Sequence, residues 1–133
     1  MVNLSWGPLI VARLGHAYNC HSSLNPPATY YNAILIVKEG VSVTGGLKVH
    51  TFPGSHMGRH LLQMSVRFSG IDFDVMTSHL ESMKQCRDER IRQLIEVFGM
   101  MERSNRLSIF GGDLNLRDVE VRRDNMPEDT VDL

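Results

Sequence analysis

The sequence predicts a layered α/β domain, in which a mostly antiparallel β-sheet is flanked by one helix. Short segments between residues 30 and 77 alternate apolar and polar residues, as half-buried strands do. One later stretch, 83–103, repeats apolar residues at spacings of three and four, as an amphipathic helix does. Because several strands precede this helix and one follows it, the order favours a layered sheet over a doubly wound parallel one.

Composition narrows the class of protein. The chain has 133 residues, 42% of them hydrophobic, which suits one globular domain of ordinary size. Its formal net charge is −1, whereas a protein that binds nucleic acid mainly through charge is usually far more basic. Any contact with nucleic acid is therefore expected through a local site. Two cysteines, Cys20 and Cys86, are too few for a disulfide framework, and no apolar run is long enough to span a membrane.

The first 29 residues are left as an unassigned N-terminal segment. Residues 9–12 form a short apolar run that suits a buried strand, and residues 16–29, rich in Ser, Asn and Pro, predict a loop. The remainder, 30–133, is interpreted as a partial domain truncated at the C-terminus, because the sequence stops where a new apolar segment begins.

The strands are expected as follows. Residues 31–37 form one strand, and residues 41–44 and 47–52 form a hairpin around Gly45-Gly46, since glycines supply the positive φ angles of a two-residue turn. A loop covers 53–58. Residues 61–68 form a half-buried strand, and the turn Ser69-Gly70 returns the chain into an antiparallel strand over 73–77. The apolar face of the 61–68 strand is predicted to hold Leu62, Met64, Val66 and Phe68.

A helix and a final strand follow. Ser82 and Gln85 fit a capping box, which predicts a helix start near Met83, and Ser104 is expected to follow its end. The apolar helix face is predicted to hold Ile91, Leu94, Ile95, Phe98 and Met101. The basic residues Arg87, Arg90 and Arg92 alternate with acids and are interpreted as a solvated face. Residues 107–110 predict a buried central strand.

One motif that carries chemistry is the run Gly-Gly-Asp-Leu-Asn-Leu-Arg-Asp at 111–118. Asp113 comes directly after the last predicted strand, and Asn115 follows two residues later. A carboxylate there suits Mg²⁺, which prefers oxygen ligands, or it could orient a water molecule. The amide of Asn115 could hold a phosphate oxygen or that water. The alternative is an ordinary Asp-Asn turn after a strand.

A second motif, Thr-Ser-His-Leu-Glu-Ser, occupies 77–82. His79 at a strand end, three residues before Ser82 at a helix start, would make a cradle for a phosphate group. The alternatives are a simple helix N-cap for Ser82 and a backbone-satisfied histidine at the edge of the core for His79. Glu81 is expected to be a solvated acid at the start of the helix rather than a metal ligand.

Together the two motifs resemble the endonuclease/exonuclease/phosphatase superfamily. In that superfamily, a strand ending in Gly-Asp-x-Asn and an upstream strand ending in Ser/Thr-x-His-Leu face one active site. Within it, residues 76–82, residues 112–118 and the Phe52-Pro53 stretch with Arg59 are similar to the 5′-tyrosyl-DNA phosphodiesterases. The resemblance covers about residues 30–133. It implies that the chain forms part of a four-layered sandwich of sheets and helices.

The resemblance also implies a role for each matched residue. Asp113 would position or activate the attacking water, and Asn115 would stabilise charge on the phosphorus centre. His79 would hydrogen-bond the phosphate with Ser82 beside it, and Arg117 would lie by the phosphate or the DNA end. The implied reaction is in-line hydrolysis of the phosphotyrosyl bond at a 5′ DNA end, with Mg²⁺ or Mn²⁺ as cofactor.

The implied setting is DNA double-strand break repair. The partners would be DNA 5′ ends that carry a tyrosyl or topoisomerase-peptide adduct. The protein would be a monomer with no membrane association, located in the nucleus, with the cytoplasm as a second compartment.

Two parts of the family's site have no match in the sequence. The family carries a metal-binding Glu on an early strand, but Glu39 is the first acid here and lies in a Lys-Glu-Gly turn. No metal ligand is therefore identified, and the family's late Ser-Asp-His motif is not found either. The alternatives are another nuclease or phosphatase of the same superfamily, and a catalytically inactive fragment without the metal-binding Glu and the final His.

Overall fold

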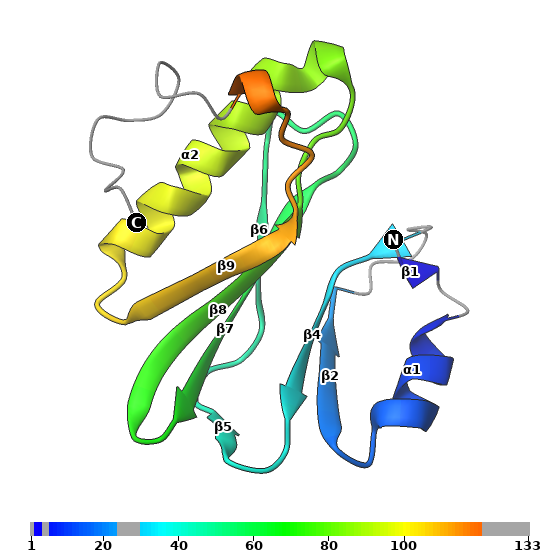
Figure 1. The fold of residues 1–133 in the computed structure, drawn as a ribbon, viewed down its shortest axis with the longest axis vertical. Helices are drawn as coiled ribbons and strands as arrows, with labels where there is room; N and C mark the ends of the chain where they lie inside the picture. Colours follow the sequence, from blue (N-terminus) through cyan, green and yellow to red (C-terminus); the bar gives the residue numbers. More distant parts are fainter. Residues whose placement is uncertain (1, 4–5, 24–29, 121–133) are drawn as a thin grey trace.

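The computed structural model describes residues 2–3, 6–23 and 30–120. Its main sheet has the strand order β5-β7-β8-β9, with β6 also paired to β7. The strands are β5 (Val41–Val43), β6 (Lys48–Thr51), β7 (His60–Phe68), β8 (Ile71–His79) and β9 (Leu107–Asp113). Figure 1 shows helix α2 (Arg87–Arg103) on one side of this sheet and a smaller sheet of β2 (Tyr18–Ser22) and β4 (Ala33–Val37) on the other.

Strands β7 and β8 form the predicted antiparallel hairpin. Phe68 pairs with Ile71, and the pairing continues to Leu61 opposite Ser78. Ser69 and Gly70 both have positive φ, at 50° and 77°, which matches the two-residue turns that suit the twist of a hairpin. The predicted strand, turn and returning strand are therefore confirmed.

The connection from β8 through α2 to β9 makes one parallel pair in the main sheet. Phe73 pairs with Leu107, and the register ends with His79 opposite Asp113. Parallel neighbours need such a crossover, and a helix usually supplies it. This topology places the carboxyl ends of β8 and β9 side by side.

Two apolar cores lie on the two faces of the main sheet. The core under α2 consists of Phe52, Leu61, Met76, Leu80, Leu94 and Val97. The core under the small sheet consists of Ile34, Ile36, Leu62, Met64 and Val66. Alternate residues of β7 therefore point to opposite faces, as the period of a strand requires. The predicted α/β layered fold class, mostly antiparallel with a flanking helix, is confirmed by this arrangement.

The remaining elements are short. They are β1 (Val2–Asn3), α1 (Trp6–Leu14), β3 (Tyr30–Tyr31) and two single turns of 3₁₀ helix, η1 (Lys84–Cys86) and η2 (Asp118–Glu120). Strands β1 and β3 pair with each other. Across the described ranges, no helix combines the length and the apolar character needed to cross a membrane.

Two predictions for the N-terminal segment are wrong. The apolar run 9–12 lies inside helix α1, and Leu9 is largely exposed. A run of four apolar residues has no readable period, so it fits a helix as well as a strand. The predicted loop 16–29 contains strand β2, which pairs antiparallel with β4 from Tyr18–Val37 to Ser22–Ala33. The rest of that loop, 24–29, lies outside the described residues.

The predicted hairpin around Gly45-Gly46 is also wrong. Strands β5 and β6 do not pair with each other but lie one after the other along β7. Between them, the amides of Thr44 and Gly45 both donate to the carbonyl of Ser65, at 2.9 and 3.3 Å. Two residues thus oppose one, in the manner of a β-bulge. The predicted loop 53–58 is confirmed.

Helix α2 differs from its prediction in start and in face. It begins at Arg87 with no side-chain cap, after Met83 adopts a positive φ of 71° and η1 intervenes. Ile95 on the predicted apolar face is 50% exposed, whereas Arg90 and Gln93 are buried. The solvated role predicted for Arg90 is therefore wrong. The helix ends at Arg103 before Ser104, as predicted.

The last strand is not the buried central strand that was predicted. Within the part of the sheet that the structure describes, β9 lies at the edge. Leu107 and Ile109 are 58% and 55% exposed. Phe68, predicted on the apolar face of β7, is also exposed.

Candidate active site

The two sequence motifs meet where β8 and β9 end. Neighbouring parallel strands place His79 opposite Asp113, and the amide of Leu80 donates to the carbonyl of Asp113 at 2.9 Å. The His79 Nε2 and Asp113 Oδ2 atoms are 3.6 Å apart. The Asp113 side chain is largely exposed and the His79 side chain is mostly covered. A carboxylate and an imidazole thus share one open edge of the sheet.

Asn115 shapes the turn that carries Asp113. Its φ is +50°, a conformation that asparagine tolerates better than most residues. Its amide donates to Asp113 Oδ1 at 3.2 Å, and its side-chain Nδ2 donates to the carbonyl of Leu80 at 3.0 Å. The Asp-Asn turn considered as an alternative is therefore present. It holds Asp113 in place and ties the β9 end to the β8 end.

The contact with Arg59 sets the tautomer of the His79 ring. Its Nη1 lies 3.0 Å from His79 Nδ1. A guanidinium has only donors, so Nδ1 must accept and the proton of the neutral ring is on Nε2, toward Asp113. Burial lowers the pKa of His79 and the Arg59 charge lowers it further, while Asp113 acts in the opposite sense. The ring is therefore a neutral donor at neutral pH. From the sequence, Arg59 has no predicted role beyond its place in the resemblance.

Ser82 faces the 53–58 loop and does not cap α2. Its Oγ donates to the sulfur of Met57 at 3.2 Å, and Arg59 Nη2 donates to the same sulfur at 3.4 Å. Arg117 lies in the exposed segment before η2, where its amide donates to Glu120 Oε2 at 3.3 Å. The structure therefore places His79, Asp113 and Asn115 together, with Ser82 facing the neighbouring loop.

The prediction for Glu81 is wrong. It is 0% exposed, and its carboxylate accepts from Ser55 Oγ, the amides of His56 and Met57, and Gln93 Nε2. Burial would raise the pKa of this carboxyl, but these hydrogen bonds outweigh burial and hold its pKa below the ordinary value. The sequence around Glu81 could not indicate this network, because the donors come from residues 55–57 and from helix α2.

A second polar cluster joins the small sheet to β7. Ser23 Oγ lies 2.6 Å from His60 Nε2, and Asn32 Nδ2 donates to the His60 carbonyl at 3.4 Å. The same carbonyl accepts from Ser78 Oγ at 2.9 Å. His60 precedes Leu61, the residue that pairs with Ser78, so this cluster adjoins the end of β8.

No family model matches this chain. It is 41% identical over 106 residues to tyrosyl-DNA phosphodiesterase 2 of Mus musculus, covering 77% of this chain and 28% of that protein. The Homo sapiens protein of the same name is 38% identical over 107 residues, covering 78% and 29%. This chain is therefore similar in sequence to tyrosyl-DNA phosphodiesterase 2. It spans less than a third of the length of these curated relatives.

Solved structures agree with this relationship. Danio rerio tyrosyl-DNA phosphodiesterase 2 complexed with a single-strand DNA product superposes with a TM-score of 0.80 and 31% identity, over 90% of this chain and 47% of that one. The Caenorhabditis elegans protein gives 0.76 and 31%, over 96% and 39%. A Bacteroides thetaiotaomicron member of the endonuclease/exonuclease/phosphatase family, at 14% identity and 0.71, shows the fold alone. The predicted family resemblance is confirmed, and the relatives are phosphodiesterases by name.

The residues described do not make up a complete magnesium site. Within 2–3, 6–23 and 30–120, no group of three or more His, Cys, Asp or Glu side chains is arranged to hold a metal ion. Asp113 offers an exposed carboxylate, but both oxygens of Glu81 are already engaged by donors. Mg²⁺ needs near-octahedral oxygen coordination. One carboxylate next to an imidazole and an amide donor does not supply that.

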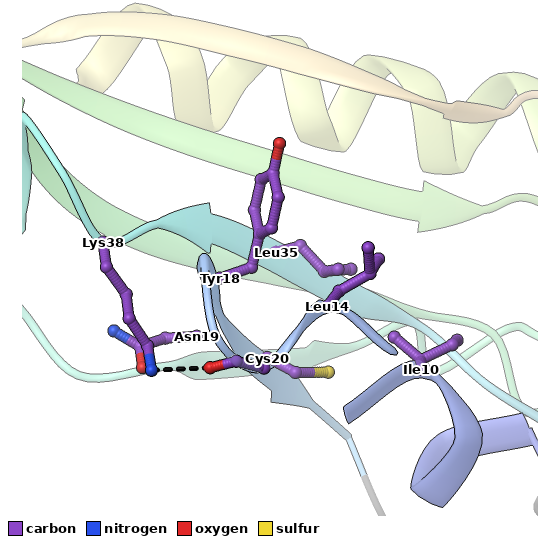
Figure 2. A pocket seen from close by; sticks show the side chains of 8 residues that line it. Ile10, Leu14, Tyr18, Asn19, Cys20, Leu35 and Lys38 are labelled. Carbon is purple, nitrogen blue, oxygen red and sulfur yellow. Dashed lines mark hydrogen bonds between the residues drawn. The ribbon is translucent and has the colours of Figure 1, made fainter. Parts of the chain in front are cut away.

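A separate pocket lies between α1 and the small sheet (Figure 2). It has a volume of about 280 Å³ and is lined by Ile10, Leu14, Cys20 and Leu35 among others. The Lys38 ammonium donates to the carbonyl of Gly15 at 2.6 Å, so this cation closes the turn after α1. Tyr18 begins β2 and Lys38 follows β4, so the pocket lies at one end of the β2–β4 pair. Ser23 follows the last residue of β2, at the other end of the pair. The pocket is therefore distinct from the edge that holds His79 and Asp113.

Proposed function

We propose that the protein hydrolyses the phosphotyrosyl bond at 5′ DNA ends and so removes trapped topoisomerase adducts in double-strand break repair. The observation that carries the proposal is the His79–Asp113 pair, 3.6 Å apart at the joined ends of β8 and β9. It occurs in a chain with 38–41% identity to tyrosyl-DNA phosphodiesterase 2 from human and mouse.

The geometry suits two parts of an in-line hydrolysis. The Nε2–H of His79, fixed by the Arg59 contact on the other ring nitrogen, donates a hydrogen bond to a phosphate oxygen. The exposed Asp113 carboxylate accepts a proton or hydrogen bond from the attacking water and orients it. Asn115 holds Asp113 through its turn. Donors aimed at the phosphate stabilise the charge that develops during the attack.

Two other side chains complete the proposed phosphate environment. Ser82, whose hydroxyl now donates to the thioether of Met57, turns to the phosphate when the substrate is bound. Arg117 is an exposed cation two residues after Asn115 and contacts the DNA end. These two roles come from the family resemblance, and the exposure of Arg117 is compatible with its role.

We further propose that the whole protein depends on Mg²⁺, with Mn²⁺ as a substitute. The resemblance implies the ion, whose chemistry is to offset charge on the phosphate oxygens. The described residues do not complete its site, so the remaining ligands would come from outside them. The partner is a DNA 5′ end with a tyrosyl or topoisomerase-peptide adduct, which fits the DNA product held by the Danio rerio relative. A nuclear monomer is the expected form.

The test is cleavage of a 5′-phosphotyrosyl oligonucleotide by the full chain, with Mg²⁺ or with a chelator. Asp113→Asn should lower turnover by about 10² to 10⁴, the range expected for loss of a general base. Asp88→Asn, at an exposed acid on the first turn of α2, is the matched control and should retain turnover.

Three results contradict the proposal in different ways. Full turnover by Asp113→Asn would remove Asp113 from the reaction. Faster cleavage of an abasic duplex, an RNA tail or a phosphoinositide would assign the chain to another activity of the superfamily. A folded chain without turnover and without Mg²⁺ binding would identify it as a catalytically inactive fragment.

A further inference from the structure

The segment between β6 and β7, residues 53–59, supplies the side chains that contact the candidate site from outside the two motifs. Arg59 reaches His79 at 3.0 Å, and Met57 receives hydrogen bonds from both Arg59 and Ser82. The segment begins and ends close together, since the amide of Phe52 donates to the carbonyl of Arg59 at 3.4 Å. Its conformation therefore sets where Arg59 and Met57 lie relative to His79.

The buried carboxylate of Glu81 accepts hydrogen bonds from this segment. Its Oε1 accepts from the amides of His56 and Met57, both at 3.1 Å. Its Oε2 accepts from Ser55 Oγ at 2.6 Å. Ser55 Oγ in turn accepts from the amide of Arg59 at 2.8 Å. Three consecutive residues of the segment are thus bound directly, and Arg59 is bound through one intermediate.

Glu81 is itself fixed by helix α2. Gln93 accepts from the amide of Glu81 at 2.9 Å and donates to its Oε2 at 3.3 Å. Gln93 is also buried, so neither side chain has a solvent alternative for these bonds. The carboxylate is therefore held rigidly two residues after His79, beneath the segment that carries Arg59.

We propose that Glu81 is a positioning residue of the candidate active site, which places Arg59 on His79 by ordering residues 53–59. It acts through the segment, because a side chain with no exposed surface cannot touch a substrate. The kinetic part of this inference rests on the proposed phosphotyrosyl hydrolysis. The structural part, the ordering of the segment, does not.

Asp74, on the strand that leads to Glu81, provides a matched control. It is also buried, and its carboxylate accepts from Ser65 Oγ and Ser104 Oγ, both at 2.7 Å. Its position near the start of β8 is far along the strand from His79, and its partners belong to β7 and to the end of α2. Asp74→Asn therefore removes a comparable buried charge without touching residues 53–59.

The first readout is amide hydrogen exchange in the full chain, with Leu61 and Leu62 as internal references. In Glu81→Gln, the amides of His56, Met57 and Arg59 should exchange about tenfold faster or more, because each loses or weakens its acceptor. Asp74→Asn should leave these three amides as slow as in the wild type. Glu81→Ala, which removes both oxygens, should exceed Glu81→Gln.

The second readout is a double-mutant cycle on turnover of the 5′-phosphotyrosyl oligonucleotide, per folded molecule. Glu81→Gln should lower kcat by about 10- to 100-fold with a smaller change in KM, as expected when a contact group is displaced by about 1 Å. Combined with Arg59→Ala, it should add little to the loss from Arg59→Ala alone, since both changes remove the same contact. Asp74→Asn and Arg59→Ala should be additive.

The outcomes separate the two ideas. Unchanged protection of His56 and Met57 in both Glu81 variants would overturn the positioning role, whatever the activity. Strictly additive losses for Glu81→Gln and Arg59→Ala would also overturn it, because Glu81 would then affect turnover independently of the Arg59–His79 contact. If the wild type does not cleave the oligonucleotide, the proposed function fails and the exchange readout still decides the role of Glu81.

Discussion

At the scale of single residues, the meeting of the two strand ends depends on the close approach of one glycine. Gly112 has a φ of +155°, and a Cβ placed on it would lie 2.1 Å from the carbonyl oxygen of Ser78. That oxygen belongs to the backbone of β8 and cannot move aside as a flexible side chain would. Gly111, its neighbour, would carry a Cβ with no atom within 4 Å. The pair therefore contains its own control.

Gly112→Ala should destabilise the fold by about 2–4 kcal/mol, the sum of a strained φ and an overlap with backbone. Gly111→Ala should change the free energy of unfolding by less than about 1 kcal/mol. Chemical denaturation of the two variants checks this. Equal effects would mean that β8 and β9 separate easily at this point, and the His79–Asp113 distance would then not be set by the strands.

The same scale shows which site residues the sequence could indicate. His79 and Asp113 could be predicted because each follows a strand and belongs to a recognisable motif. Arg59 and Glu81 could not be assigned their contacts, because these partners lie 12 to 26 residues away and only the fold brings them together. For Ser82 the sequence allows both a phosphate contact and a helix cap, because serine before a helix usually caps it. The intervening turn η1 removes it from that position.

At the scale of elements, helix α2 is held at its N-terminal end by a buried ion pair. Arg90 is 0% exposed, and its Nε and Nη2 both donate to the carboxylate of Glu120 in η2. Its Nη1 donates to the carbonyls of Glu81 and Met83. All three nitrogens of this guanidinium therefore donate hydrogen bonds. The pair ties α2 to the segment that follows Asp113.

Glu120→Ala should lower the free energy of unfolding by about 3–5 kcal/mol, because it leaves the charge of Arg90 buried without its counter-ion. Arg67→Ala is the contrasting variant. Arg67 pairs with Asp72 across the β7–β8 hairpin and neither side chain is buried, so its loss should cost about 1 kcal/mol or less. Thermal or denaturant unfolding measures both. A small effect of Glu120→Ala would mean that Arg90 reaches water when its partner is lost.

Element prediction succeeded where the local pattern was long and regular. The alternation in 61–68 and the Ser69-Gly70 turn gave β7, the hairpin and β8. Strands β5 and β6 lie within their predicted ranges, but their pairing as a hairpin is wrong, because a Gly-Gly pair between two short strands fits a hairpin and a bulge equally well. The predicted apolar face of α2 is also wrong in part, since Ile95 is exposed and Arg90 and Gln93 are buried. Arg90 and Gln93 are buried because Glu120 and Glu81 satisfy their polar groups through hydrogen bonds. The spacing of apolar residues cannot predict such partners.

At the scale of the whole molecule, the two faces of the main sheet are covered unequally. Helix α2 covers one face over the core that contains Leu61 and Leu80. On the other face, the small sheet covers β7, but Leu107 and Ile109 of β9 remain exposed beside Phe73 and Val75. An apolar hollow of about 260 Å³ continues from Ile109 toward Leu35 of β4.

Fold class could be predicted from the sequence, but this uneven covering could not. The apolar run 107–110 predicts burial, and a strand's side chains show the same pattern whether or not a second layer covers them. Burial is a property of what packs against the strand. The sequence of β9 therefore indicated an apolar face correctly and its exposure wrongly.

This exposed face should dominate the surface behaviour of the 133-residue chain. Contiguous exposed apolar area is a site of association, whereas single exposed side chains are ordinary. The double variant Leu107→Thr with Ile109→Thr should reduce the fluorescence of a bound hydrophobic dye about twofold or more and reduce self-association in sedimentation. Threonine is β-branched and favours strands, so β9 should stay folded by circular dichroism. Ile95→Thr is the control, since Ile95 is 50% exposed on the outward face of α2 and its replacement should have no effect on either signal.

If Ile95→Thr lowers the dye signal as much as the double variant does, the dye does not report on the β9 face. If neither variant changes the dye signal, a second copy of the chain covers that face in solution. The chain should then sediment as a dimer.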